Sequence, residues 1–193
     1  MAPAHAEIVL VRHGETEWSA KGRHTSATDL PLVQDGRRRA RALGAELAGR
    51  AFALVLCSPL LRATETCELA GFGEAAVTCK ELREWDYGRY EGMTTDEIRR
   101  ADPSWSLWRD GCPDGEAPEQ VGARADRVLA RLRGAGGDSL AFAHGHILRV
   151  LTARWIGMAP AGGAHFLLAA GALGVLGYER ETEAVSRWNA SPS

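Results

Sequence analysis

The sequence predicts an α/β fold, a three-layer α/β/α sandwich whose central sheet is mostly parallel. Short apolar runs alternate with helical patterns along most of the 193 residues, as expected when crossover helices join parallel strands. Two of these runs end alike, in a histidine followed by a glycine, at His13 and at His144. The length suits one core, so we expect a single domain over residues 1–193.

Three strands and two helices are predicted in the first 80 residues. The strands are expected at residues 8–11, 53–57 and 75–78, and the helices at residues 37–47 and 59–70. In the first helix, Ala40, Leu43 and Leu47 recur at helical spacing. The second helix is expected to begin with Ser58 as its N-cap and Pro59 at its first helical position.

The next segment, residues 81–92, is rich in aromatic residues, glycine and charge without clean periodicity, and we interpret it as a functional loop. Later helices are expected at residues 95–101, 105–109, about 121–132, and after residue 146 to about 155, with a turn-rich stretch at 111–118 and strands at 139–143, 172–178 and 184–188. These elements complete a twisted sheet with helices on both faces.

The charge balance indicates a small partner. The net charge is −2, and 23 basic and 25 acidic residues are intermixed. The sequence shows neither a basic face for nucleic acid nor a polybasic membrane anchor. We therefore expect a small-molecule partner, no nucleic acid and no membrane contact. The oligomeric state stays open, and a homodimer is one state that the sequence allows.

The cysteines and the N-terminal residues predict a cytoplasmic protein. Cys57, Cys67, Cys79 and Cys112 show no CxxC spacing, which favours reduced thiols over a disulfide framework. Met1–Ala6 lacks the apolar region of a signal peptide. No run approaches the roughly 18 apolar residues of a membrane span.

The strongest chemical signal is Arg12-His13-Gly14, directly after the first predicted strand. Ligands bind at the carboxyl ends of strands in open α/β sheets. Arginine offers a permanent charge and a planar set of donors that match phosphate oxygens, and Gly14 permits close approach. A neutral imidazole is a competent nucleophile near neutral pH. The motif therefore predicts a phosphate site around His13.

Two further residues are expected at the same sheet edge. His144 also follows an apolar strand, and Arg62 lies in the first turn of a helix, where backbone amides favour anions. A leaving alkoxide needs a proton, and the loop at residues 81–92 offers Glu84 and Asp86. Glu84 is the preferred acid, although spacing does not decide between the two.

Together these motifs resemble the histidine phosphatase superfamily, also called phosphoglycerate mutase-like, almost from end to end. The matching segments are residues 11–16, 58–62, 82–92 and 143–146. The resemblance implies a phosphoglycerate mutase-like fold, and phosphorylation of His13, with Glu84 as proton donor and later base. It also implies that Arg12, Arg62 and His144 bind the phosphoryl group, and that Ser19, Thr25 and Tyr87 line the substrate pocket. His24, directly before Thr25, joins this set.

The phosphatase branch is favoured over the mutase branch. Phosphoglycerate mutases of this superfamily are longer and carry extra cationic contacts after the acid loop. Thr95 stands here where they have a lysine, and Asp110 where they have a second arginine, which weakens binding of a second anion. The stretch Trp105–Glu116 resembles acid phosphatases and sugar-bisphosphate phosphatases. Ser26 departs from the usual glycine of these relatives.

The sequence therefore predicts a phosphomonoester hydrolase of the histidine acid phosphatase type, with a phosphohistidine intermediate and a small phosphorylated metabolite as substrate. We expect no cofactor and no metal ligands, because arginines beside the histidines repel a divalent cation. The alternatives are a cofactor-dependent phosphoglycerate mutase and a catalytically silent phosphate-binding scaffold. A metal-dependent phosphoesterase is disfavoured. The natural substrate and the pathway are not identified by the sequence.

Overall fold

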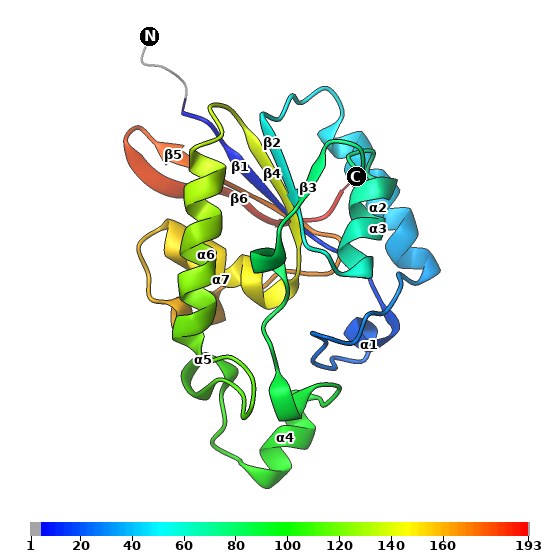
Figure 1. The fold of residues 1–193 in the computed structure, drawn as a ribbon, viewed down its shortest axis with the longest axis vertical. Coiled ribbons are helices and arrows are strands. Elements are labelled where there is room, and N and C mark those ends of the chain that lie inside the picture. The colour runs from blue at the N-terminus through cyan, green and yellow to red at the C-terminus, as the bar shows by residue number, and fades with distance from the viewer. Residues whose placement is uncertain (1–4, 193) are drawn as a thin grey trace.

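In the computed structural model, which describes residues 5–192, a sheet lies between two layers of helices (Figure 1). The strands are β1 (Ile8–Arg12), β2 (Leu54–Cys57), β3 (Ala76–Thr78), β4 (Ser139–Ala143), β5 (Leu173–Glu179) and β6 (Thr182–Ala190). Within the described residues they form one sheet in the order β3-β2-β4-β1-β5-β6. The predicted three-layer α/β/α sandwich is confirmed.

The sheet is mostly parallel. β1 pairs with β4, β4 with β2, and β2 with β3 in parallel, whereas β5 runs antiparallel to both β1 and β6. The pairing of β1 with β4 places Arg12 opposite Ala143. His13 and His144 therefore leave two neighbouring strands at the same level of the sheet, as the sequence predicts.

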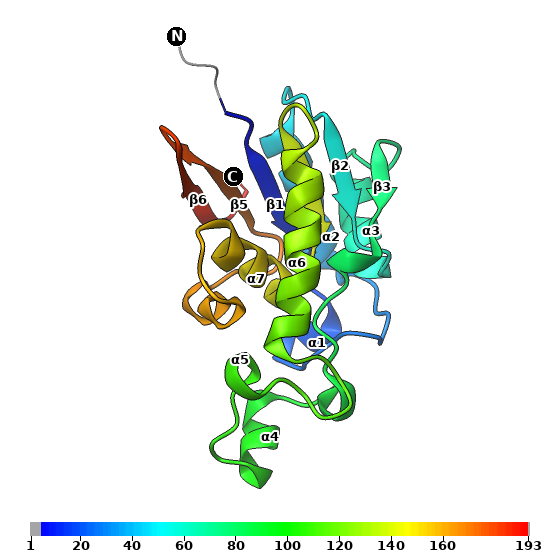
Figure 2. The same ribbon diagram turned by 60° about the vertical axis from the view of Figure 1, so that its left-hand side comes forward.

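Four long helices cover the two faces (Figure 2). α2 (Gln34–Leu47) and α3 (Leu61–Leu69) lie on one face, and α6 (Pro118–Arg133) and α7 (Gly145–Trp155) on the other. Alternate residues of β1 pack into two separate hydrophobic cores. Val9 and Val11 pack with α2 and α3, and Ile8 and Leu10 pack with α6 and α7. An apolar run buried on both faces is typical of a parallel strand.

Short elements gather beyond the carboxyl ends of the parallel strands, in the lower part of Figure 1. They are α1 (Glu17–Ala20), α4 (Thr95–Ala101) and α5 (Leu107–Asp110). The predicted loop at residues 81–92 contains the 3-10 turns η1 (Lys80–Leu82) and η2 (Gly88–Tyr90), and η3 (Pro160–His165) follows α7. α1 and η3 were not predicted, because elements this short carry little periodicity.

The predicted start of α3 is wrong. The helix begins at Leu61, after Leu60 as a cap without a side-chain hydrogen bond. Ser58 Oγ lies instead 2.7 Å from His144 Nε2. Asp29 Oδ1 accepts the backbone N–H of Leu61 at 2.7 Å. Partners distant in sequence thus replace the expected local cap.

No helix in residues 5–192 is long and apolar enough to cross a membrane. The sequence expectation about Met1–Ala6 falls in part on residues 1–4, which lie outside the described residues, as does residue 193 of the expected domain.

Gly36 lies where α2 contacts the segment after β1, so a substitution at this position tests that contact. A Cβ at this position would overlap the backbone of Glu15, whose nitrogen would lie at 2.7 Å. Overpacking costs about 1–3 kcal/mol, which exceeds the gain of about 1 kcal/mol in helix propensity. We expect Gly36→Ala to lower the free energy of unfolding in urea by about 1 kcal/mol. Gly134→Ala is the control, since its nearest neighbour lies at 3.3 Å. Equal stability of both variants would contradict this close contact.

Candidate active site

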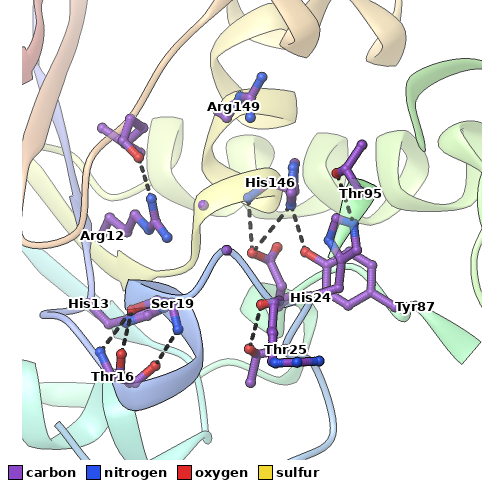
Figure 3. Close-up of a pocket in the computed structure, with 15 residues that line it drawn as sticks. Arg12, His13, Thr16, Ser19, His24, Thr25, Tyr87, Thr95, His146 and Arg149 are labelled. Carbon is purple, nitrogen blue, oxygen red and sulfur yellow. Dashed lines mark hydrogen bonds and ion pairs between the residues drawn. The ribbon is translucent and has the colours of Figure 1, made fainter. Parts of the chain in front are cut away.

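A cavity of about 240 Å³ lies beyond the carboxyl ends of β1 and β4 (Figure 3). Seven of the residues predicted for the site line it: Arg12, His13, Ser19, His24, Thr25, Glu84 and Tyr87. The other two, Arg62 and His144, do not line the cavity and are fully buried. The His144 and His13 rings are nonetheless close, with centroids 5.1 Å apart. The fold therefore brings the predicted residues to one place.

His13 is a buried, neutral imidazole. Its Nδ1 lies 2.7 Å from the carbonyl oxygen of Gly14, which can only accept, so Nδ1 carries the proton and Nε2 keeps its lone pair. Burial, and then the charges of Arg62 and Arg12, hold the pKa of His13 well below its usual 6.5, against the opposing hydrogen bond to Gly14. The ring can therefore present an unprotonated nitrogen at neutral pH.

Arg12 has a donor without a protein partner. Its Nη1 donates to the carbonyl oxygen of Leu168 at 2.5 Å. Its Nε is buried and has no hydrogen-bond partner among residues 5–192. A buried, unpaired N–H group costs about 1–3 kcal/mol. This donor of a cavity-lining residue is therefore uncompensated within the described residues.

Arg62 and His144 form a hydrogen-bonded network behind the cavity. Arg62 Nε donates to His144 Nδ1 at 3.1 Å, and its terminal nitrogens donate to the carbonyl oxygens of Thr25, Ser26 and Thr28. His144 Nε2 therefore carries the ring proton and donates to Ser58 Oγ. Burial, and then the charge of Arg62, hold the pKa of His144 well below 6.5.

Glu84 is held by backbone amides at the start of α7. Its Oε1 accepts from the N–H groups of Trp85 at 2.9 Å and Ile147 at 3.0 Å. Its Oε2 accepts from the N–H of His146 at 3.0 Å. Helix N-termini favour negative charge. The carboxyl group is thus fixed at the cavity wall, with one lone pair of Oε2 still free.

The outer wall contains aromatic and hydroxyl groups. His24 and Tyr87 stack with centroids 4.6 Å apart, and burial lowers the pKa of His24 to about 4. Burial, and then the charge of Glu84, raise the pKa of Tyr87. Thr25 Oγ1 donates to the carbonyl oxygen of Arg23. Ser19 Oγ accepts from the N–H of Thr16 and so caps α1.

Several cavity residues were not predicted as site residues. They are Thr16, Gly22, Arg23, Thr95, Gly145, His146, Arg149 and Leu168. Arg149 follows His146 by three positions and therefore lies on the same side of α7. That spacing was a signal available in the sequence. For Arg23 the sequence contains no such signal, because this residue reaches the cavity only through the tertiary fold.

Other residues weighed from the sequence lie outside the cavity. Asp86 is exposed and accepts from the N–H of Gly88, so it is not placed with His13. Arg109 and Asp110 pair with each other at 2.7 Å on the surface. Ser26 lines a neighbouring cleft, and its N–H donates to Glu91. Among residues 5–192, no group of three or more His, Cys, Asp or Glu side chains is arranged to hold a metal ion.

The sequence pattern of the histidine phosphatase superfamily (branch 1) matches residues 8–191. The chain belongs to this superfamily.

Named relatives of this histidine phosphatase agree with the assignment. It is 40% identical over 188 residues to the acid phosphatase of Mycobacterium tuberculosis, covering 93% of this chain and 90% of the relative. It is 36% identical over 182 residues to the sedoheptulose 1,7-bisphosphatase of Saccharomyces cerevisiae, covering 78% and 67%. The solved structure of the Mycobacterium tuberculosis open reading frame Rv3214 matches with a TM-score of 0.92 at 36% identity, covering 97% and 99%.

Together the superfamily and these relatives confirm the prediction of a phosphatase, a phosphomonoester hydrolase. Relatives named 2,3-bisphosphoglycerate-dependent phosphoglycerate mutase also match, at 32–35% identity. They are more distant than the two phosphatases, so the mutase alternative is the weaker one.

The histidines of this histidine phosphatase give a pH prediction. We expect His13 and His144 to stay neutral well below pH 6.5, and His24 to protonate at about pH 4. Since the same histidines protonate near 6.5 in the unfolded chain, the free energy of unfolding falls as the pH drops below 6.5 toward the folded values. Side-chain NMR of labelled histidines against pH measures these values. Titration of His13 near 6.5 would contradict the burial of its ring.

Proposed function

We propose that this phosphatase hydrolyses small phosphorylated metabolites through a phosphohistidine at His13. The observation that carries the proposal is the hydrogen bond from His13 Nδ1 to Gly14, which leaves the Nε2 lone pair available beside two arginines. Nε2 attacks phosphorus, a P–N bond forms, and the bond from phosphorus to the leaving oxygen breaks. Water then attacks the same phosphorus, the P–N bond breaks, and inorganic phosphate leaves.

Glu84 is the proposed acid and base. In the first step it gives its proton to the departing oxygen, and in the second it takes a proton from the attacking water, so its protonation state is restored after each turnover. The supporting geometry is the free lone pair of Oε2, because Oε1 already accepts two N–H groups and Oε2 only one. Oε2 is therefore the oxygen that carries the proton.

We propose that Arg12 and Arg62 hold the phosphoryl group by their charge, and that His144, whose two ring nitrogens are already bonded, acts through Arg62. Arg12 offers its unpaired Nε. Arg62 contributes a fixed charge close enough to lower the pKa of His13, while most of its N–H groups hold the loop that follows His24. His144 holds Arg62 in position. Positive charge at the equatorial oxygens stabilises the transition state.

The substrate is a phosphomonoester whose leaving group occupies the cavity next to Ser19, His24, Thr25 and Tyr87. A volume of about 240 Å³ suits a metabolite better than a polymer. The named activities of the acid phosphatase and sugar-bisphosphatase relatives support this class. Because the guanidinium groups occupy the place of a cation, the reaction needs no metal.

We also propose that residues 1–193 form one domain and that the protein is located in the cytoplasm. The four free cysteines support a reducing compartment.

The nucleophile is tested with His13→Ala. Removing Nε2 removes the atom that forms the P–N bond, so release of phosphate from p-nitrophenyl phosphate should fall by at least about a thousandfold. The assay contains EDTA, and His5→Asn, an exposed histidine far from the cavity, is the control. Wild-type turnover in His13→Ala would overturn the assignment. Loss of wild-type activity in EDTA would overturn the metal-free reaction.

Glu84→Gln tests the acid and base. An amide has no acidic proton, so kcat for an alkyl phosphate should fall by about 10²- to 10⁴-fold. p-Nitrophenolate leaves without help, so with p-nitrophenyl phosphate the first step proceeds, the second stalls, and phosphohistidine accumulates. Rapid quenching in alkali followed by detection of phosphohistidine measures this. Equal losses with both substrates and no phosphohistidine would assign Glu84 to positioning alone.

A further inference from the structure

We propose that His146 determines substrate specificity by donating a hydrogen bond from Nε2 to an oxygen atom of the leaving group. This inference rests on the proposed function and concerns the part of the substrate that departs. The acceptor is a hydroxyl or an oxyanion on the carbon skeleton beyond the scissile bond. His146 belongs to the His-x-His motif, whose first member alone takes part in the proposed mechanism.

The position of His146 is fixed relative to the acid. Its backbone N–H donates to Glu84 Oε2 at 3.0 Å, and its ring Nδ1 lies 3.9 Å from the same oxygen. Figure 3 shows the His146 ring at the cavity wall, between Tyr87 and the helix that carries Arg149. The ring and the carboxyl group of Glu84 are therefore neighbours on the wall of the same cavity.

Tyr87 fixes the tautomer of the ring. The Tyr87 hydroxyl lies 2.6 Å from His146 Nδ1 and has no other hydrogen-bond partner among residues 5–192. Tyr87 is only 2% exposed, so its proton must find a protein acceptor. The phenol therefore donates to Nδ1, and the single proton of the neutral imidazole resides on Nε2.

Packing holds the ring in this orientation. Trp108 and Trp85 meet it edge to face, with centroids at 5.3 Å and 6.4 Å. The His24 ring is also close, with its centroid 6.0 Å from that of His146. His146 Nε2 has no hydrogen-bond partner within the described residues, and the residue lines the cavity. The structure thus contains a preorganised N–H donor without a partner.

The donor selects by hydrogen bonding rather than by charge. Burial, and then the charge of Arg149, hold the pKa of His146 well below 6.5, so the ring stays neutral at pH 7. A protonated Nε2 cannot accept a hydrogen bond. A leaving group with a hydroxyl or an oxyanion at this point gains binding energy, whereas an unsubstituted aryl group gains none.

Three substrates and two substitutions test the inference. Phenyl phosphate has no acceptor on its leaving group, glycerol 3-phosphate has hydroxyl groups, and fructose 1,6-bisphosphate has both hydroxyl groups and a second phosphoryl group. His146→Asn removes the donor at the Nε2 position and keeps a polar group near Tyr87. His146→Gln keeps an N–H near the Nε2 position. His5→Asn is the matched control outside the cavity.

The quantity compared is kcat/KM for an acceptor-bearing substrate divided by kcat/KM for phenyl phosphate. In His146→Asn we expect this ratio to fall about threefold to tenfold for a hydroxyl acceptor and about tenfold or more for an oxyanion, mainly through KM. His146→Gln should restore most of the ratio. A fall only with fructose 1,6-bisphosphate identifies the acceptor as the second phosphoryl group. Equal losses on all three substrates would overturn the inference and assign His146 to positioning of Glu84.

The tautomer is tested independently of turnover. Nitrogen NMR of labelled histidine distinguishes the protonated from the unprotonated ring nitrogen. We expect the Nε2–H form for His146 in the wild type and a mixture of both forms in Tyr87→Phe. An Nδ1–H form in the wild type would overturn the inference and leave the phosphohistidine mechanism intact. Normal turnover of all three substrates in His13→Ala would instead overturn the proposed function.

Discussion

The buried guanidinium of Arg62 is the interaction on which the site depends. A charge removed from water is costly, and it is tolerated only when its donors are paired. Arg62 meets this condition through the carbonyl oxygens of Thr25, Ser26 and Thr28 and through His144. These partners come from the loop before α2 and from the end of β4. One side chain therefore joins three distant segments around the histidines.

The carboxyl group of Glu84 is held in a different way. Glu84 accepts hydrogen bonds from two backbone amides at the start of α7 and from that of Trp85, so the acid is placed by main-chain geometry. Its own segment is held from behind, because Arg124 donates to the carbonyl oxygens of Glu81, Arg83 and Glu84 and pairs with Glu116. The backbone that precedes and includes Glu84, in the irregular stretch at residues 81–92, is thus held in place by Arg124.

The sequence predicts the layers, the strands and the long helices because the strands are short apolar runs, as in Ile8–Val11, and the helices repeat apolar residues at helical spacing, as in Ala40, Leu43 and Leu47. It also predicts that His13 and His144 meet, since both follow parallel strands. It misses the start of α3, because the amide of Leu61 is bound by Asp29, 32 residues earlier. Arg149 could have been inferred from its spacing to His146 on α7, whereas Arg23 reaches the cavity through tertiary packing, which no local pattern encodes.

The unpaired Nε of Arg12 has a consequence for how the enzyme responds to its surroundings. Under the proposed mechanism Arg12 holds the transferring phosphoryl group, and such a site also fits free orthophosphate, which offers the same kind of oxygen atoms. That mechanism implies that the released product competes with each new substrate molecule for this donor. It also implies that turnover slows where phosphate is abundant and rises where phosphate is scarce.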